Sequence, residues 1–195
     1  MTKITVLWVT LIFGIQTILA QEVNLKTSVS SSIFTDEQWP GTSTRRQGYS
    51  VGFDVIIKDG SSVIMPGLHF QKTSLFPVTV DWKKPFQEYT DFKTIKMPLQ
   101  LGLYALTNKY AHILLHGGLV AHFLLGMDEN DKVIEEDLNE IRGGAIIGVS
   151  ARILFLTAHA SYEYGLTPVF VKNGPSGIIN KSKENAFAIG VGVFF

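Results

Sequence analysis

The feature that most constrains this sequence is an alternation of apolar and polar residues that recurs along nearly the whole chain after residue 20. In Tyr49–Lys58 the odd positions carry aromatic or β-branched side chains, and the even positions carry mostly small or charged ones. The segments Ile95–Leu106, Leu156–Leu166 and Phe187–Phe195 repeat this pattern. A period of two is typical of a β-strand with two different faces. The chain is therefore expected to be all-β.

The connections between these segments alternate strictly in length. The expected strands, of which the serine-rich first is the least regular, are Asn24–Phe34, Tyr49–Lys58, Ser62–Gln71, Ile95–Leu106, Ala111–Leu125, Gly143–Arg152, Leu156–Leu166 and Phe187–Phe195. The expected tight connections are Asp59–Ser61, Thr107–Lys109 and Ile153–Phe155. The expected long ones are Thr35–Gln47, Lys72–Phe92, Gly126–Glu140 and Thr167–Glu184. This arrangement predicts an eight-stranded antiparallel up-and-down transmembrane β-barrel with short periplasmic turns and long external loops.

Alternation alone leaves open which face points outward, because a soluble lipocalin-like barrel also alternates. Charged residues make up only 17% of the chain, compared with about 25% in an average soluble domain. The polar face is rich in small residues, which suit the narrow interior of a small barrel. Aromatic residues of the apolar face gather toward the expected external ends, as an interfacial girdle would: Tyr49, Phe70, Phe123, Tyr162, Tyr164 and Phe187. These features favour a lipid-facing exterior.

The N-terminus has the pattern of a secretory signal peptide. Lys3 precedes an apolar run from Ile4 to Leu19, and cleavage is expected between Ala20 and Gln21. A transmembrane anchor is the alternative interpretation, since the run approaches the ~18–20 residues that a spanning helix needs. We expect residues 1–20 to be a signal peptide and residues 21–195 to be an outer-membrane β-barrel domain. The chain contains no cysteine, which excludes disulfides and thiolate metal sites.

Several short motifs resemble those of a known family. They are Met97-Pro98-Leu99, Gly117-Gly118, Tyr162-Glu163-Tyr164-Gly165-Leu166-Thr167 and Gly190-Val191-Gly192-Val193-Phe194-Phe195. The chain resembles the porin-like outer-membrane β-barrel family of Bacteroidetes, which includes PorT-like proteins. The resemblance covers the chain after residue 20 and implies the fold and a location in the outer membrane of a Gram-negative bacterium. It also implies that Phe195 is the terminal aromatic residue read by the outer-membrane insertion machinery during assembly.

Polar and charged residues on the inward face are expected to form a network in the lumen. The candidate residues are Asp54, Lys96, Gln100, His112, His116, Arg152, His159 and Glu163. All five histidines of the chain, including His69 and His122, fall on this face. Because a buried ion needs a partner, cross-strand ion pairs are expected, with Arg152 and Glu163 as one candidate pair. Such a network would fill the lumen and oppose a wide pore.

Two chemical interpretations are weaker. His112 and His116 share a face, but four strand residues span about 13 Å, too far to share one metal ion without a third strand. His159, Ser161 and Glu163 are the residue types that lipid A deacylases use for catalysis, but the alternation places them on the inward face, away from lipid. The third long loop is acidic and its spacing does not fit an EF-hand, while basic residues such as Arg46 and Lys72 fall in other expected loops. No catalytic residue, metal site or cofactor is expected.

The leading functional expectation is a non-enzymatic barrel that binds or scaffolds through its external loops or lipid-facing wall, as a subunit of a larger envelope assembly. The alternatives are a narrow passive channel for small solutes and a lipid-modifying serine hydrolase. The expected partners are outer-membrane lipids and lipopolysaccharide, the insertion machinery and an envelope complex. Nucleic acid is not expected, because the formal net charge is zero.

Overall fold

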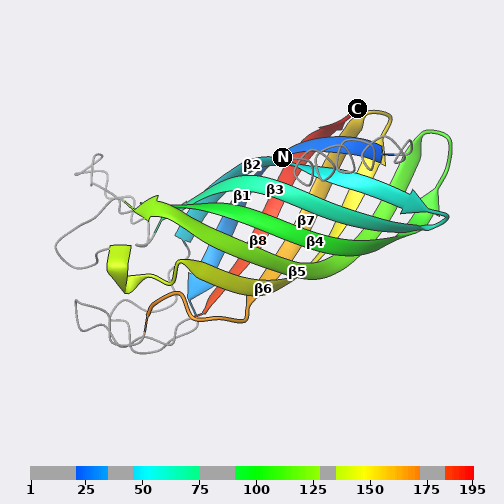
Figure 1. Ribbon diagram of the computed structural model, residues 1–195. Coiled ribbons are helices and arrows are strands. Elements are labelled where there is room, and N and C mark those ends of the chain that lie inside the picture. Colours follow the sequence, from blue (N-terminus) through cyan, green and yellow to red (C-terminus); the bar gives the residue numbers. More distant parts are fainter. Residues whose placement is uncertain (1–20, 35–45, 75–90, 128–134, 172–182) are drawn as a thin grey trace, which may run out of the picture.

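The computed structural model describes residues 21–34, 46–74, 91–127, 135–171 and 183–195. Eight antiparallel strands pair in chain order, and the last pairs with the first, so the sheet closes into a barrel (Figure 1). The strands are β1 (Gln21–Phe34), β2 (Arg46–Asp59), β3 (Ser62–Ser74), β4 (Asp91–Thr107), β5 (Ala111–Met127), β6 (Ile141–Ile153), β7 (Leu156–Gly165) and β8 (Glu184–Phe194). A short 3-10 helix, η1 (Glu135–Asp137), precedes β6. The structure confirms the predicted fold class.

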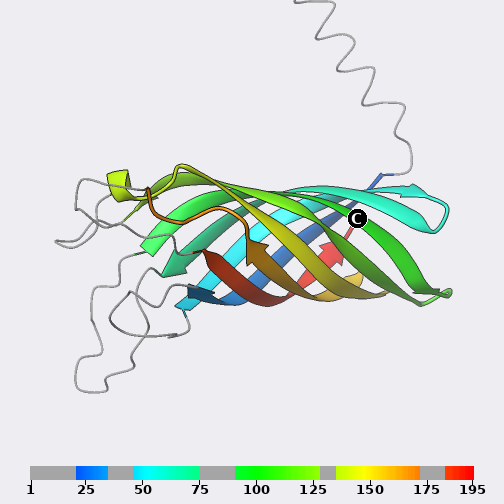
Figure 2. The same ribbon diagram turned by 90° about the horizontal axis from the view of Figure 1, so that it is seen from below.

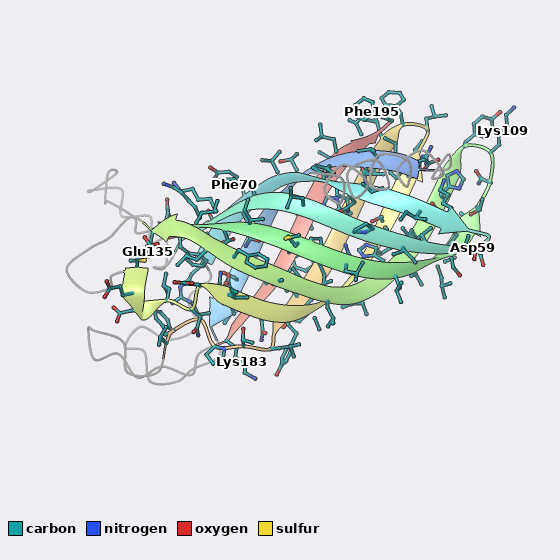
Figure 3. The ribbon with its side chains drawn as sticks, viewed as in Figure 1. Asp59, Phe70, Lys109, Glu135, Lys183 and Phe195 are labelled. Carbon is teal, nitrogen blue, oxygen red and sulfur yellow. The ribbon has the colours of Figure 1, made fainter. Side chains whose placement is uncertain are left out.

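The short turns gather at one end of the barrel, where β1 begins and β8 ends. Figure 3 shows Asp59 and Lys109 at this end, and Glu135 and Lys183 at the opposite end. The C-terminus is tied to the same end, because the Phe195 amide donates to the Val23 carbonyl at 2.9 Å. By the usual orientation of such barrels, this is the periplasmic end.

Local chemistry explains two of the three tight turns. Gly60 adopts φ = 60° in the β2–β3 turn, a conformation that glycine reaches at little cost. In the β4–β5 turn the Asn108 side chain accepts hydrogen bonds from the amides of Tyr110 and Ala111, at 2.9 and 2.7 Å. The β6–β7 turn instead places Leu154 at φ = 55°, which is unusual for a residue with a Cβ atom.

Alternation of burial along the strands shows that the apolar face is the outer one. Leu101 and Leu119 are each 64% exposed, although leucine is normally among the most buried residue types. Asp54 and Thr94, which face inward, are fully buried. Figure 2 shows the same barrel from below, with its strands wound obliquely around it. The inside of this barrel is therefore polar and its outside is apolar, as expected for a wall that faces lipid.

The strands extend further into the expected loops than the sequence predicts. Lys72–Ser74 and Asp91–Phe92 were expected in a long connection, but they complete β3 and β4. Thr73 and Phe92 are almost fully buried and continue the inward alternation, so the barrel wall is taller at its external end.

Two further expectations about position are wrong. Leu106 was expected inside, but a β-bulge after Tyr104 pairs Leu106 with outward Ile113 and leaves it 47% exposed. Arg46, expected in a loop, is the first residue of β2 and is buried.

The expected signal peptide lies outside the described residues, and so does Ala20 of the expected cleavage site. Gln21, on the other side of that site, is the first residue of β1. Among the residues that the structure describes, no helix is long and apolar enough to cross a membrane.

Candidate functional site

The centre of the lumen is organised around Asp54. This β2 carboxylate accepts a hydrogen bond from Lys26 Nζ at 2.5 Å, and its second oxygen lies 2.8 Å from His69 Nε2. Because Asp54 and Lys26 are both buried, neither charge can be solvated by bulk water, and each depends on the other. Lys26, on the serine-rich first strand, was not among the predicted lumen charges.

A second carboxylate, Glu163 of β7, lies nearer the external end. It accepts a hydrogen bond from Lys96 Nζ at 2.6 Å, and its other oxygen lies 2.5 Å from His122 Nε2. β7 does not pair with β4 or β5, so these side chains meet across the lumen. The predicted pairing of Glu163 with Arg152 is wrong: Arg152 is opposite Thr157, six residues from Glu163 along β7, or about 20 Å.

Arg152 belongs to a third group at the periplasmic end. Its guanidinium donates to Glu22 at 2.5 Å, while Lys58 lies 2.7 Å from the other Glu22 oxygen. The guanidinium also stacks over the inward Phe194 ring, 4.2 Å from its centroid. An aromatic ring and a cluster of ion pairs therefore occupy the periplasmic end of the lumen.

A fourth group of charged residues lies at the external end. Arg142 donates to Glu184 at 2.8 Å and lies over the Phe92 ring, 4.8 Å from its centroid. Sequence reasoning missed both charged residues because Glu184 fell in an expected loop and Arg142 just before an expected strand. Extending the expected strands toward their starts, by one residue for β6 and by three residues for β8, would have placed both inside.

Two further predicted histidines make hydrogen bonds or ring contacts in the lumen. His116 lies 2.6 Å from Gln100 Oε1 and 3.1 Å from Ser150 Oγ, and so links three strands. His112 stacks edge-to-face on Tyr104, with ring centroids 5.8 Å apart.

His159 faces inward and borders the same central cavity as Ser161, well away from the lipid-facing surface. Its Nδ1 atom is buried and has no hydrogen-bond partner within the described chain. Across those residues, no group of three or more histidines or carboxylates is arranged to hold a metal ion.

An apolar cluster lies inside the barrel just above the periplasmic ion group. Four inward-facing side chains, each 2–5% exposed, form it: Ile56, Val63, Met65 and Leu114. Tyr104 and Phe194 pack against this cluster. The sequence analysis described the inward face as mainly polar and did not predict this cluster. The available signal was the interruption of the polar set by large apolar residues at even positions of β2 and β5.

The external mouth is closed by the inner ends of two connections. A β-bridge joins Leu138 to Phe170, and the Val171 amide donates to the Asp137 carbonyl at 2.8 Å. Asn139 adds side-chain hydrogen bonds to the carbonyls of Pro168 and Phe170, at 2.9 and 3.1 Å. We call residues 135–140 and 166–171 the external cap.

The external cap packs directly onto the barrel. Leu138, Val169 and Phe170 form one buried cluster with the inward Phe92 of β4. Leu124 and Met127 of β5 pack against its edge. The cap is thus held by both hydrogen bonds and apolar burial at the mouth of the lumen.

Between the two closures, the lumen contains small cavities of about 10, 20, 20 and 40 Å³. A cavity needs ~10–15 Å³ to hold one water molecule. These spaces therefore fit single waters or small groups of waters. Each of these spaces is far smaller than a wide aqueous pore.

The closed barrel and its apolar exterior define the class of the protein: an eight-stranded transmembrane β-barrel of the outer-membrane type. This architecture places the chain in the outer membrane. No protein-family model and no curated protein matches the sequence.

Several solved structures are similar to it. The attachment invasion locus protein Ail of Yersinia pestis, solved with the heparin analogue sucrose octasulfate, has a TM-score of 0.46 and 13% identity, over 90% of this chain and 99% of that chain. Neisserial surface protein A has a TM-score of 0.47 and 13% identity, over 90% and 97%. OprG from Pseudomonas aeruginosa has a TM-score of 0.46 and 13% identity, over 90% and 95%. Such low identity speaks only to fold, so the class assignment rests on this chain's own barrel and exterior.

Proposed function

We propose that this protein is a non-enzymatic outer-membrane barrel that binds a partner through its external surface, as a subunit of a larger envelope assembly. The observation that carries the proposal is the external cap, in which the described ends of two connections pack on a buried apolar cluster at the mouth of the barrel. A fixed surface loses little conformational entropy when a partner binds.

The cap presents charge to the outside. Glu135, Glu136 and Glu140 are exposed on it, while Asp137 and Leu138 turn inward and are buried. Buried anchors beneath an exposed acidic rim suit a protein contact with a basic partner surface, since complementary charge favours encounter and fixes orientation.

The passive-channel alternative is disfavoured by the filled lumen. Ion pairs cross the interior at several depths, and apolar clusters lie near both ends. The hydrolase alternative is disfavoured by geometry, because His159 and Ser161 face the lumen while lipid substrates lie outside. Lipids and lipopolysaccharide around the wall, and the insertion machinery during assembly, complete the proposed set of partners.

Cross-linking in intact cells followed by affinity purification and mass spectrometry tests the proposal. The wild-type chain should recover a defined envelope protein, and the double charge reversal Glu135→Lys with Glu136→Lys should lose it. Lys109→Glu reverses a charge at the periplasmic turn and serves as the matched control, which should retain the partner. Equal recovery by all three chains, or recovery of no partner by the wild type, would contradict binding through the cap.

A further inference from the structure

A groove of about 810 Å³ runs over the lipid-facing wall in the periplasmic half of the barrel. It crosses four neighbouring strands, β3 to β6, and reaches the end of β2. Its walls are outward apolar side chains: Ile57, Ile64, Leu101, Leu103, Leu115 and Ile147. Pockets for small molecules commonly measure about 300–1,000 Å³, so the groove is large enough for a specific ligand.

The floor of the groove is Gly117, an outward position in the middle of β5. Its cross-strand partners are Leu101 on β4 and Ile147 on β6, both more than 60% exposed. A glycine between two large side chains leaves a gap in an otherwise continuous apolar wall. The groove therefore follows directly from the sequence at this position.

The barrel itself does not require glycine there. A Cβ atom added at the inward Gly118 would lie 2.1 Å from the Leu99 carbonyl oxygen, so packing demands glycine at that position. At Gly117 the nearest atom would be the Ile146 carbonyl oxygen at 3.3 Å, a contact relieved by a shift of a few tenths of an ångström. Glycine weakens a strand interior, and often marks a place where a ligand approaches the backbone closely.

One end of the groove is polar. Asp59 and Ser62, both exposed beside the β2–β3 turn, border it at the periplasmic end of the barrel, where Figure 3 shows Asp59. Within the described part of the chain, Asp59 takes part in no ion pair. A free carboxylate at the interface, next to an apolar groove in the membrane, matches a ligand with a cationic head and a hydrocarbon tail.

We propose that this groove binds one phospholipid of the periplasmic leaflet with an amine-bearing headgroup. One acyl chain lies over Gly117 between Leu101 and Ile147, and the headgroup ammonium contacts Asp59. The membrane around the barrel supplies the acyl chains, and the carboxylate selects an ammonium group over an anionic headgroup without an amine. This site is separate from the external cap, so its failure would leave the proposed function untouched.

Native mass spectrometry of the purified barrel tests this proposal. The protein is delipidated and then offered equal amounts of phosphatidylethanolamine and phosphatidylglycerol with identical chains. The wild type should retain one phosphatidylethanolamine per monomer. Gly117→Leu fills the floor and should lower retention about tenfold. Ala160→Leu adds the same side chain to the outward face of β7, outside the groove, and should retain lipid as the wild type does.

Asp59→Asn tests the contact with the headgroup. Asp59 is the exposed last residue of β2, beside the turn, so this variant remains informative if Gly117→Leu assembles poorly. It should reduce the preference for phosphatidylethanolamine about fivefold, the size expected for one exposed ionic contact. Equal binding of both lipids by the wild type, or unchanged retention by folded Gly117→Leu, would overturn the proposal. The proposal would also be overturned if the wild type were a dimer and Gly117→Leu a monomer, because the groove would then bind a second copy of the chain and not a lipid.

Discussion

Each inward carboxylate in the described barrel is matched by nearby basic side chains. Asp54, Glu163 and Glu22 each contact two of them, and Glu184 contacts Arg142. A buried ion is costly unless its charge and hydrogen-bonding capacity are satisfied, so the network stabilises the barrel only as a complete set. Removing one member should therefore cost more than removing a whole pair.

Asp54→Ala leaves Lys26 buried without its carboxylate and should destabilise the barrel by about 3–5 kcal/mol. The double substitution Lys26→Met with Asp54→Asn removes both charges and should cost clearly less. Lys72→Ala breaks a partly exposed pair with Asp91 and, as a control, should cost about 1 kcal/mol or less. Equilibrium urea unfolding in lipid vesicles measures all three, and equal losses for the single and double Asp54 variants would refute the network account.

Deletion of Phe195 separates two roles for the terminal residue. Its side chain is 76% exposed and projects from the barrel end (Figure 3), so its loss as mere lipid-facing surface would cost about 1.5–3 kcal/mol. If the insertion machinery reads Phe195, refolding into detergent should stay near normal while surface assembly in cells becomes slow. Equal defects in both assays would favour simple destabilisation, and unimpaired assembly would exclude a special role.

At the scale of strands, the sequence predicts most of the wall and little of the interior. Alternation in β2 and β7 identifies inward Asp54 and Glu163 because a period of two depends only on local spacing. The contact between Lys96 and Glu163 is not local: it joins β4 to β7 across the lumen, and its depth depends on the stagger of every strand between them. The Leu106 bulge was missed for a related reason, since the extra residue is defined by the partner strand.

The lipid-facing wall makes a prediction that depends on depth. Leu119 lies at the middle of β5 and is 64% exposed, so Leu119→Arg should cost about 2–4 kcal/mol. Ile153 is equally outward but ends β6 at the periplasmic turn, where Ile153→Arg should cost about 0–1 kcal/mol. Unfolding free energies measured in lipid vesicles compare the two, and equal costs would place the membrane elsewhere on the barrel.

At the scale of the whole molecule, side chains pack at both ends of the described barrel: the external cap lies at one mouth, and Phe194, Arg152 and the apolar cluster lie at the other. Purified monomer in planar lipid bilayers should therefore show little or no steady current. Large, reproducible single-channel steps from the monomer would contradict the closed lumen and favour the passive-channel alternative.

The central claim is that alternate positions along each strand face lipid and the positions between them face a polar lumen; in β4 as far as Tyr104, the odd positions face lipid and the even positions face the lumen. Because the natural chain has no cysteine, single cysteines can carry a small fluorophore at chosen sites, here Leu99, Leu101 and Leu103 outside and Gln100 and Tyr104 inside. Quenching by nitroxide-labelled lipids in reconstituted vesicles should be strong at the three outward sites and weak at the two inward ones. Uniform quenching, or strong quenching at the inward sites, would contradict the membrane barrel.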